Sequence, residues 1–309
     1  MKLIKPKFWD KQYLTLQSLI LYPFTFILDL RNLNLLFNKP KKFSDIKTIC
    51  VGNIYLGGTG KTPLVDCLAK ILKKKFRSAI IKKEYQSHLD EKLLLEQNNK
   101  VFFKKDRNSS LLDAVRKKFE LAIFDDGLQD NKIEYDLKIV CFNSITLAGN
   151  GLRLPAGPLR ERLNSLLKYD AVFITGYNKN KEFEKKLKKI NPDISIFHGE
   201  YISTNFHIFK KYNYLVFCGI GNPLSFTDTL KKYKIRYKKK IIFPDHYNYS
   251  EEDLQKINKI AKDKTLKLLT TEKDFHRIPR NYRKNINYLK IDLKIKKKQE
   301  FNKFIMKFL

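Results

Sequence analysis

The stretch that most constrains this chain is residues 51–65, with the sequence VGNIYLGGTGKTPLV. An apolar, β-prone run leads into a glycine-rich turn, and the turn leads into an amphipathic helix that begins near Gly60. Glycines allow successive backbone N–H groups to point at one place, and the helix directs its positive end to the same place. The stretch therefore predicts a phosphate-binding loop between a strand and a helix.

The residues expected to hold a nucleotide lie in this loop. They are Gly57, Gly58, Thr59, Gly60, Lys61 and Thr62. Lys61 is expected to reach the β- and γ-phosphates of ATP, and the Thr62 hydroxyl to bind Mg²⁺. The strict pattern G-x-x-x-x-G-K-[ST] requires glycine at position 55, where this chain has Tyr55. The alternative interpretation is a glycine-rich turn with a surface lysine.

Length and composition set broad limits. The chain has 309 residues, enough for two domains, and its hydrophobic content of 43% excludes wholesale disorder. Four cysteines, at positions 50, 67, 141 and 218, form no C-x-x-C pair, which argues against a disulfide framework and a zinc site. The net charge of +31 would attract anionic lipid, phosphorylated substrates or nucleic acid. Because the lysines are spread along the chain, we infer no nucleic-acid site from this charge.

The N-terminal stretch 8–37 is rich in apolar and aromatic residues. Pro23 and Asp29 argue against a membrane-spanning helix, and no small-residue cleavage site follows that would mark a signal peptide. Basic residues flank the stretch on both sides, which is typical of a helix that lies in the headgroup region of an anionic membrane. We therefore predict a membrane-associating helix region over residues 1–40. The alternative is a helix docked on the core of its own domain.

Strand-like runs recur along the chain and alternate with helix-compatible segments. The first set of runs comprises residues 47–51, 78–82, 100–103, 121–124, 137–142 and 170–175. This alternation predicts an α/β fold, with a P-loop NTPase-like, mainly parallel sheet and helices on both faces, over residues 41–212. Later runs predict a second, smaller α/β domain over residues 213–285. The last residues, 286–309, are expected to return to the first domain.

Two carboxylates end the apolar run 121–124. Asp125 and Asp126 are followed by a glycine. In a P-loop protein, a carboxylate at a neighbouring strand end binds Mg²⁺ or a water molecule coordinated to it. Asp125 and Asp126 are therefore candidate metal residues. The alternative is an ordinary Asp-Gly turn between a strand and a helix.

Two further segments have compositions that are unusual for generic loops. Residues 149–161 form a Gly- and Pro-rich loop that ends in Arg160 and Glu161. Residues 243–247 place His246 beside Asp245 just after a strand-like run. Pro244 and Asp245 restrict the surroundings of this histidine, whereas we expect structural roles for the other four histidines of the chain.

Taken together, these segments resemble one family, the tetraacyldisaccharide 4′-kinases of lipid A biosynthesis. The matching blocks follow the order of the family: GNIYLGGTGKTPLV (52–65), DDGLQ (125–129), LPAGPLRER (154–162), GIGNPLSF (219–226), FPDHYNYSEEDL (243–254) and TTEKD (270–274). The loop of the family also lacks the first glycine, so Tyr55 agrees with the resemblance. The apolar N-terminal stretch is similar to the membrane-associating helix of the family.

The resemblance implies an ATP- and Mg²⁺-dependent kinase of a Gram-negative bacterium. Its acceptor would be the 4′-hydroxyl of a tetraacylated glucosamine disaccharide 1-phosphate. The implied location is the cytoplasmic face of the inner membrane, where the protein would be peripheral or monotopic and would contact the anionic surface through its N-terminal helix. A nucleic-acid partner is not expected.

The resemblance also implies roles for individual residues. The family pairs an aspartate with a histidine to activate the acceptor hydroxyl, and these carry over to Asp90 and His246. Asp90 comes from Leu89-Asp90-Glu91-Lys92, the best counterpart of the Gly-Asp-Glu-Pro block of the family. Lys61 completes the catalytic set. The remaining implied residues are Gln129 for the nucleotide, Thr62, Asp125, Asp126 and Glu161 for the metal, and Arg160 for the substrate.

The chain departs from the family at two places. Lys83-Glu84-Tyr85 stands where the family usually has Arg-Gly-Tyr, with a shorter loop before Asp90, and Asp130 stands where the family has histidine. A P-loop ATPase or GTPase that acts as a membrane-associated assembly factor or switch would share the glycine loop, the aspartates and the basic helix. It would not need His246 or the 154–162 block. A nucleic-acid binder driven by the positive charge is a second alternative.

Overall fold

The structure is a computed structural model that describes residues 5–26, 40–85 and 89–309. The chain divides into two compact units. Of the described residues, unit 1 comprises 85, 89–97 and 201–294, and unit 2 comprises 5–26, 40–84, 98–200 and 295–309. The parts of the predicted N-terminal helix region over 1–4 and 27–39, and the structural role expected for His88, lie outside the described residues.

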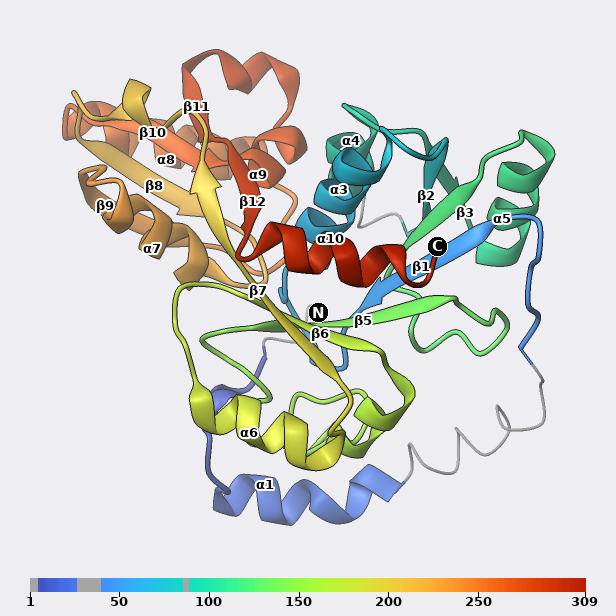
Figure 1. Cartoon of the computed structure of the whole chain (residues 1–309). Helices are drawn as coiled ribbons and strands as arrows, with labels where there is room; N and C mark the ends of the chain where they lie inside the picture. Colours follow the sequence, from blue (N-terminus) through green and yellow to red (C-terminus); the bar gives the residue numbers. More distant parts are fainter. Residues whose placement is uncertain (1–4, 27–39, 86–88) are drawn as a thin grey trace. The chain divides into compact units, whose positions relative to one another are not determined.

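Unit 2 is built on a mainly parallel sheet (Figure 1), as predicted, with the order β12-β7-β6-β5-β1-β4-β2-β3. Its strands are β1 (Lys47–Gly52), β2 (Ser78–Lys83), β3 (Val101–Lys104), β4 (Leu121–Asp125), β5 (Leu137–Asn143), β6 (Ala171–Thr175), β7 (Ser195–Ser203) and β12 (Ile291–Ile295). The chain passes from one unit to the other within β7 and β12. These two strands are antiparallel, since the N–H of Lys296 donates to the carbonyl of His198 and that of Thr204 to the carbonyl of Lys290.

Helices cover both faces of this sheet, as the alternation of strand-like and helix-compatible segments predicted. They are α3 (Lys61–Leu72), α5 (Arg107–Arg116), α6 (Lys181–Ile190) and α10 (Lys298–Met306). Phe142 of β5 packs edge-on against Phe183 of α6, and Phe173 of β6 against Phe301 of α10. The register partner of Phe173 is Cys141, not Phe142. Because successive residues of a strand point to opposite faces, α6 and α10 lie on opposite sides of the sheet.

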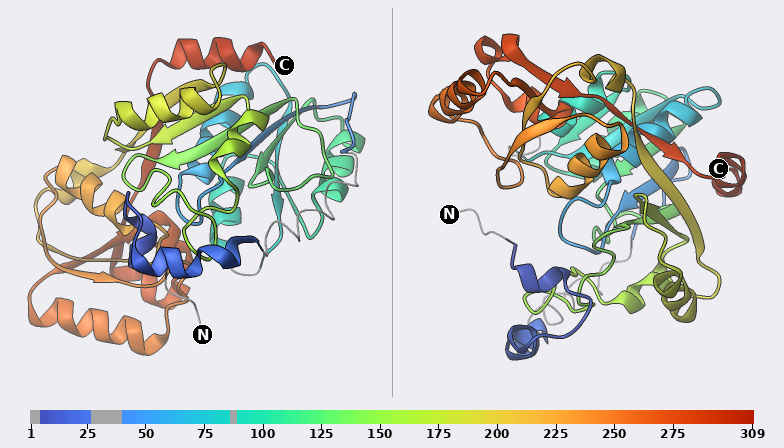
Figure 2. Two further views of the ribbon diagram at one scale, coloured as in Figure 1. Left: turned by 90° about the horizontal axis from the view of Figure 1, so that it is seen from below. Right: turned by 90° about the vertical axis from the view of Figure 1, so that its left-hand side faces the viewer.

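The N-terminal segment of unit 2 contains η1 (Lys7–Asp10), α1 (Leu16–Leu21) and η2 (Tyr22–Thr25). This dark blue segment lies against the loop 149–161 (Figure 2). The Trp9 indole N–H donates to the carbonyl of Pro155 at 3.0 Å, and Arg153 Nη2 donates to the carbonyl of Thr25 at 2.7 Å. Across the residues that are described, we find no helix that is both long and apolar enough to span a membrane.

Unit 1 contains the predicted smaller α/β fold. Its parallel sheet has the order β11-β10-β8-β9, with β8 (Tyr214–Cys218), β9 (Tyr237–Ile242), β10 (Lys267–Thr271) and β11 (Ile286–Leu289). Its helical elements are α4 (Leu89–Glu96), η5 (Phe206–Phe209), α7 (Pro223–Lys232), α8 (Glu251–Asp263), α9 (Glu272–Arg277) and η6 (Arg280–Asn285). Although α4 comes from an earlier part of the chain, it packs against α9.

Candidate active site

The glycine-rich loop joins β1 to α3 at the carboxyl end of the sheet in unit 2. Gly60 is the N-cap of α3 and has a φ of 90°, in the left-handed region that glycine adopts readily. The Thr62 hydroxyl donates to Asp125 Oδ2 at 3.0 Å, and Lys61 Nζ lies 3.7 Å from Asp126 Oδ2. The loop therefore brings a hydroxyl and an ammonium to the two carboxylates at the end of β4.

The Asp126 carboxylate lies close to two cationic side chains, Lys61 and Arg160. The φ of Asp126 is 64°, and its carboxylate accepts from Arg160 Nη1 at 3.2 Å. Burial raises the pKa of the Asp126 carboxyl, but the nearby Lys61 and Arg160 outweigh burial and lower it. Asp126 is therefore ionised at neutral pH and holds both cations at the loop.

Asp125 is completely buried, and its two oxygens differ. Oδ2 accepts from the Thr62 hydroxyl and lies 2.5 Å from Lys82 Nζ. Oδ1 accepts no hydrogen bond from the described residues. A buried carboxylate oxygen without a protein partner beside a threonine hydroxyl is the oxygen donor set that Mg²⁺ prefers. Thr62 and Asp125 therefore fit the metal that the family implies.

The loop 149–161 is fastened to the glycine-rich loop. The Leu56 N–H donates to the carbonyl of Pro158 at 2.8 Å, and the Arg160 N–H to the carbonyl of Ile54 at 2.7 Å. These bonds hold Arg160 and Glu161 next to the phosphate-binding loop.

Glu161 and Gln129 form one hydrogen-bonded group. The Gln129 amide N–H donates to Glu161 Oε1 at 2.6 Å and to the carbonyl of Asn53 at 3.0 Å. The Tyr169 hydroxyl donates to Glu161 Oε2 at 2.9 Å. Both oxygens of Glu161 thus already have protein partners. No cluster of three or more His, Cys, Asp or Glu side chains suited to a metal ion occurs in the parts of the chain that are described.

His246 and Asp90 lie together in unit 1. His246 follows β9 with a φ of 54°, and its backbone N–H donates to the carbonyl of Gly219 at 3.1 Å. His246 Nδ1 is 3.7 Å from Asp90 Oδ1. This separation is too long for a hydrogen bond, but it allows direct electrostatic attraction between an imidazolium and the carboxylate.

Asp90 is surrounded by cationic groups. Arg277 Nε donates to Asp90 Oδ2 at 2.8 Å, and Lys273 Nζ lies 3.8 Å from the same oxygen. Burial raises the pKa of Asp90, but His246, Lys273 and Arg277 together outweigh burial and lower it to about 2. Asp90 is therefore a carboxylate at neutral pH and is poorly suited to accept a proton from a substrate.

A second carboxylate in unit 1 holds the backbone at Gly219, to which the backbone of His246 is hydrogen-bonded. Asp274 is fully buried and accepts hydrogen bonds from the Gly219 N–H at 2.9 Å and from the Tyr249 hydroxyl at 2.8 Å. Arg277 Nη1 donates to Asp274 Oδ1 at 3.2 Å and to the carbonyl of Gly219 at 2.8 Å. Since Gly219 also accepts from His246, this network fixes the position of the histidine backbone.

Six residues of these networks were not predicted from the sequence: Lys82, Arg107, Tyr169, Lys273, Asp274 and Arg277. Lys273 and Asp274 belong to the TTEKD block, so a signal for them existed, whereas no motif marks the other four. Arg107 Nη1 lies 3.1 Å from Asp130 Oδ2, and its Nη2 donates to the carbonyl of Asp126. Asp130, where the resemblance implied a histidine, is therefore held by an arginine.

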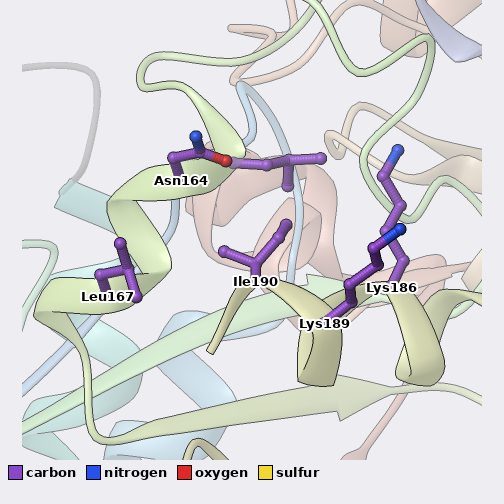
Figure 3. Close-up of a pocket in the computed structure, with 6 residues that line it drawn as sticks. Asn164, Leu167, Lys186, Lys189 and Ile190 are labelled. Carbon is purple, nitrogen blue, oxygen red and sulfur yellow. The ribbon is translucent and has the colours of Figure 1, made fainter. Parts of the chain in front are cut away.

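The predicted site residues fall into two groups. The glycine loop, Asp125, Asp126, Gln129, Arg160 and Glu161 belong to unit 2, whereas Asp90 and His246 belong to unit 1. An open groove with a volume of about 610 Å³ also lies in unit 2, between η4 (Leu163–Lys168) and α6 (Figure 3). It is lined by Leu163, Asn164, Leu167, Lys186, Lys189 and Ile190. None of the predicted site residues lines this groove.

Known proteins resemble this chain over nearly its whole length. The profile of the LpxK family, tetraacyldisaccharide-1-P 4′-kinase, matches residues 15–309. A tetraacyldisaccharide 4′-kinase of Pelagibacter ubique is 44% identical, with coverage of 99% of this chain and 98% of the relative. One of Rickettsia akari is 35% identical at the same coverage. The crystal structure of LpxK from Aquifex aeolicus in complex with ATP is 27% identical with a TM-score of 0.71, and the match covers 95% of this chain and 99% of that chain.

Proposed function

The chain belongs to the tetraacyldisaccharide-1-P 4′-kinase family, and we propose that it uses ATP to phosphorylate the 4′-hydroxyl of a tetraacylated glucosamine disaccharide 1-phosphate in lipid A biosynthesis. The hydrogen bond from Thr62 to Asp125 joins the phosphate-binding loop to the acidic strand end, but a switch or assembly factor would need this pair too. The observation that carries the proposal is the Asp90–His246 pair in unit 1, for which a switch or assembly factor would have no use.

On the nucleotide side, we propose that Lys61 binds the β- and γ-phosphates and that Arg160 stabilises charge on the transferred phosphoryl group. Asp126 orients both cations, since it contacts each of them. When bound, Mg²⁺ would neutralise phosphate charge, and Thr62 and Asp125 are the residues that would hold it. Glu161 is bound by Gln129 and Tyr169. We propose that it orients Gln129 beside the nucleotide.

On the acceptor side, we propose that the His246 imidazole takes the proton of the 4′-hydroxyl as the phosphoryl group is transferred. Asp90 then stabilises the imidazolium that forms, because it remains a carboxylate and lies 3.7 Å from Nδ1. The Asp274–Arg277 network supports this arrangement, since it fixes Gly219 and anchors Asp90. Asp90 is thus a positioning residue, and His246 is the base.

The test is transfer of ³²P from Mg·ATP to the disaccharide lipid in detergent micelles. We expect transfer by the intact chain, and we expect His246→Ala and Lys61→Ala each to lower kcat by roughly 10² to 10⁴. His207→Ala is the matched control, because His207 is exposed on η5 in the same unit as His246. Near wild-type turnover in both active-site variants would contradict the assignment.

We also propose that the N-terminal segment binds the anionic inner-membrane surface on its cytoplasmic face. In a helix docked on a protein core, apolar residues are buried and polar residues are exposed. In α1 and η2 the pattern is the opposite, since Ser18 and Thr25 are buried while Leu16 and Ile20 are 74% and 62% exposed. Further exposed apolar residues are Tyr13, Leu14, Leu19, Tyr22, Phe24 and Phe26. Exposed lysines at positions 7 and 11 add attraction to anionic headgroups.

A further inference from the structure

Lys82 is a buried lysine at the proposed metal site, and the mechanism above gives it no role. Its side chain is 4% exposed, and its Nζ lies 2.5 Å from Asp125 Oδ2. Lysine is almost never fully buried unless it is paired. The ion pair with Asp125 must therefore compensate for the water that the Lys82 ammonium loses on burial.

The strand register places this ammonium beside Asp125. Lys82 and Asp125 are direct partners in the parallel pairing of β2 with β4. Register partners on neighbouring strands present their side chains to the same face of a sheet. The contact between Lys82 and Asp125 is therefore fixed by the pairing of two strands of unit 2. It is not a chance contact of a mobile surface side chain.

The ammonium takes the oxygen that also binds Thr62. Oδ2 of Asp125 receives both the Thr62 hydroxyl and Lys82 Nζ, whereas Oδ1 is buried and receives no hydrogen bond from the described residues. Without a divalent cation, Asp125 is thus already neutralised by one positive charge from the protein.

We infer that Lys82 is a built-in counter-cation that competes with Mg²⁺ for Asp125 and thereby sets how much Mg²⁺ the protein needs to bind ATP. The inference rests on the proposed function, in which Thr62 and Asp125 hold the metal. A divalent cation that approaches Asp125 is repelled by an ammonium only a few ångströms away, and this repulsion is strong in a site that excludes water. The ammonium must therefore leave Asp125 or share it when the metal arrives.

The test measures binding of a fluorescent ATP analogue by the full chain while free Mg²⁺ is varied. We expect Lys82→Met to lower the free Mg²⁺ concentration at half-maximal binding by roughly tenfold, since the competing charge is gone. We also expect Mg·ATP to raise the melting temperature more in this variant than in the wild type. Lys104→Met is the matched control. Lys104 makes an equally short contact, 2.5 Å to Asp113, at the end of the neighbouring strand β3, but its side chain is 46% exposed. Its loss should leave the Mg²⁺ midpoint unchanged.

Because Lys82→Met leaves a buried carboxylate unpaired, Lys82→Gln is measured beside it, as glutamine can still donate a hydrogen bond to Asp125 without a charge. A lowered Mg²⁺ midpoint in either variant supports the inference. An unchanged or raised midpoint in the folded variants overturns it. Equal weakening of ATP binding in EDTA and at saturating Mg²⁺ also overturns it, because Lys82 would then bind the phosphates directly. A lowered midpoint in a chain that transfers no phosphate to the lipid would contradict the proposed function alone.

Discussion

At the residue scale, the ionised state of Asp90 makes a prediction about stability. Its pKa is about 2 in the folded protein against an ordinary value of 3.8, so its contribution is complete above about pH 4 and is lost as the pH falls toward 2. The shift corresponds to about 2 kcal/mol of folding free energy. We expect Asp90→Asn to lower the free energy of unfolding by at least about this amount at pH 7, and by much less near pH 2.5. Urea unfolding at both pH values measures the difference.

Glu91→Gln serves as the control for this experiment. Glu91 follows Asp90 on α4 and contacts the same lysine at 2.7 Å, but its side chain is 15% exposed against 1% for Asp90. The ion pair between Glu91 and Lys273 should therefore contribute less than Asp90 does to the free energy of unfolding. A loss of stability in Asp90→Asn that is the same at pH 7 and at pH 2.5 would show that the charge of Asp90 is not the cause.

At the scale of elements, the loop 149–161 connects the N-terminal segment to the phosphate-binding loop. Gly149 has a φ of 59°, and a Cβ atom there would lie 2.2 Å from the carbonyl oxygen of Trp9. We expect Gly149→Ala to displace the N-terminal segment. Backbone strain and the clash together should lower the free energy of unfolding by about 2 to 4 kcal/mol. Trp9 is the single tryptophan of the chain and is buried. Its fluorescence should therefore shift to the red and report the displacement.

Gly151→Ala isolates the backbone term in that experiment. Gly151 also has a positive φ, of 77°, but a Cβ atom there would meet only Lys186 Nζ at 4.0 Å. We expect this variant to lower the free energy of unfolding by about 1 to 2 kcal/mol and to leave the Trp9 emission unchanged. The proposed link between the loop and the N-terminal segment would be wrong if the two variants gave the same emission.

At the scale of the whole molecule, the exposed apolar side chains of α1 predict how the protein partitions between water and membrane. Insertion of the Leu16 and Ile20 side chains into the membrane together contributes roughly 3 kcal/mol to the free energy of membrane binding. The double variant Leu16→Glu/Ile20→Glu should therefore weaken binding to anionic vesicles by about 10² or more. Co-sedimentation with vesicles that contain phosphatidylglycerol measures the binding. Phosphoryl transfer to a lipid presented in detergent micelles should fall much less than transfer to the same lipid in vesicles.

The control for membrane binding is Ile208→Glu. Ile208 is 57% exposed on η5 of unit 1, so it tests whether any added carboxylate weakens binding. We expect this variant to bind vesicles like the wild type. Equal binding by the α1 variant and the wild type would exclude the N-terminal segment as the membrane contact.

The fold was largely predictable because its signals are local. Short apolar runs bounded by turns gave most of the strands, and the glycine turn before Lys61 gave the start of α3. Other features were not predictable, because they depend on contacts between distant parts of the chain. The α4 helix groups with residues 201–294, although it lies between β2 and β3 in the sequence. Its packing against α9 brings Asp90 to Arg277, which is 187 residues away.

Local spacing in the chain was sufficient to identify three chemical features: the glycine loop with Lys61 and Thr62, the carboxylates that end β4, and the histidine that follows β9. The charged side chains that contact these residues could be identified only from the folded structure. Lys82 reaches Asp125 through the register of β2 with β4, and Arg277 joins Asp90 to the carbonyl of Gly219, which also accepts from the His246 backbone. Register and packing place residues that are far apart in the chain at hydrogen-bonding distance. The spacing of residues within one segment contains no information about such contacts.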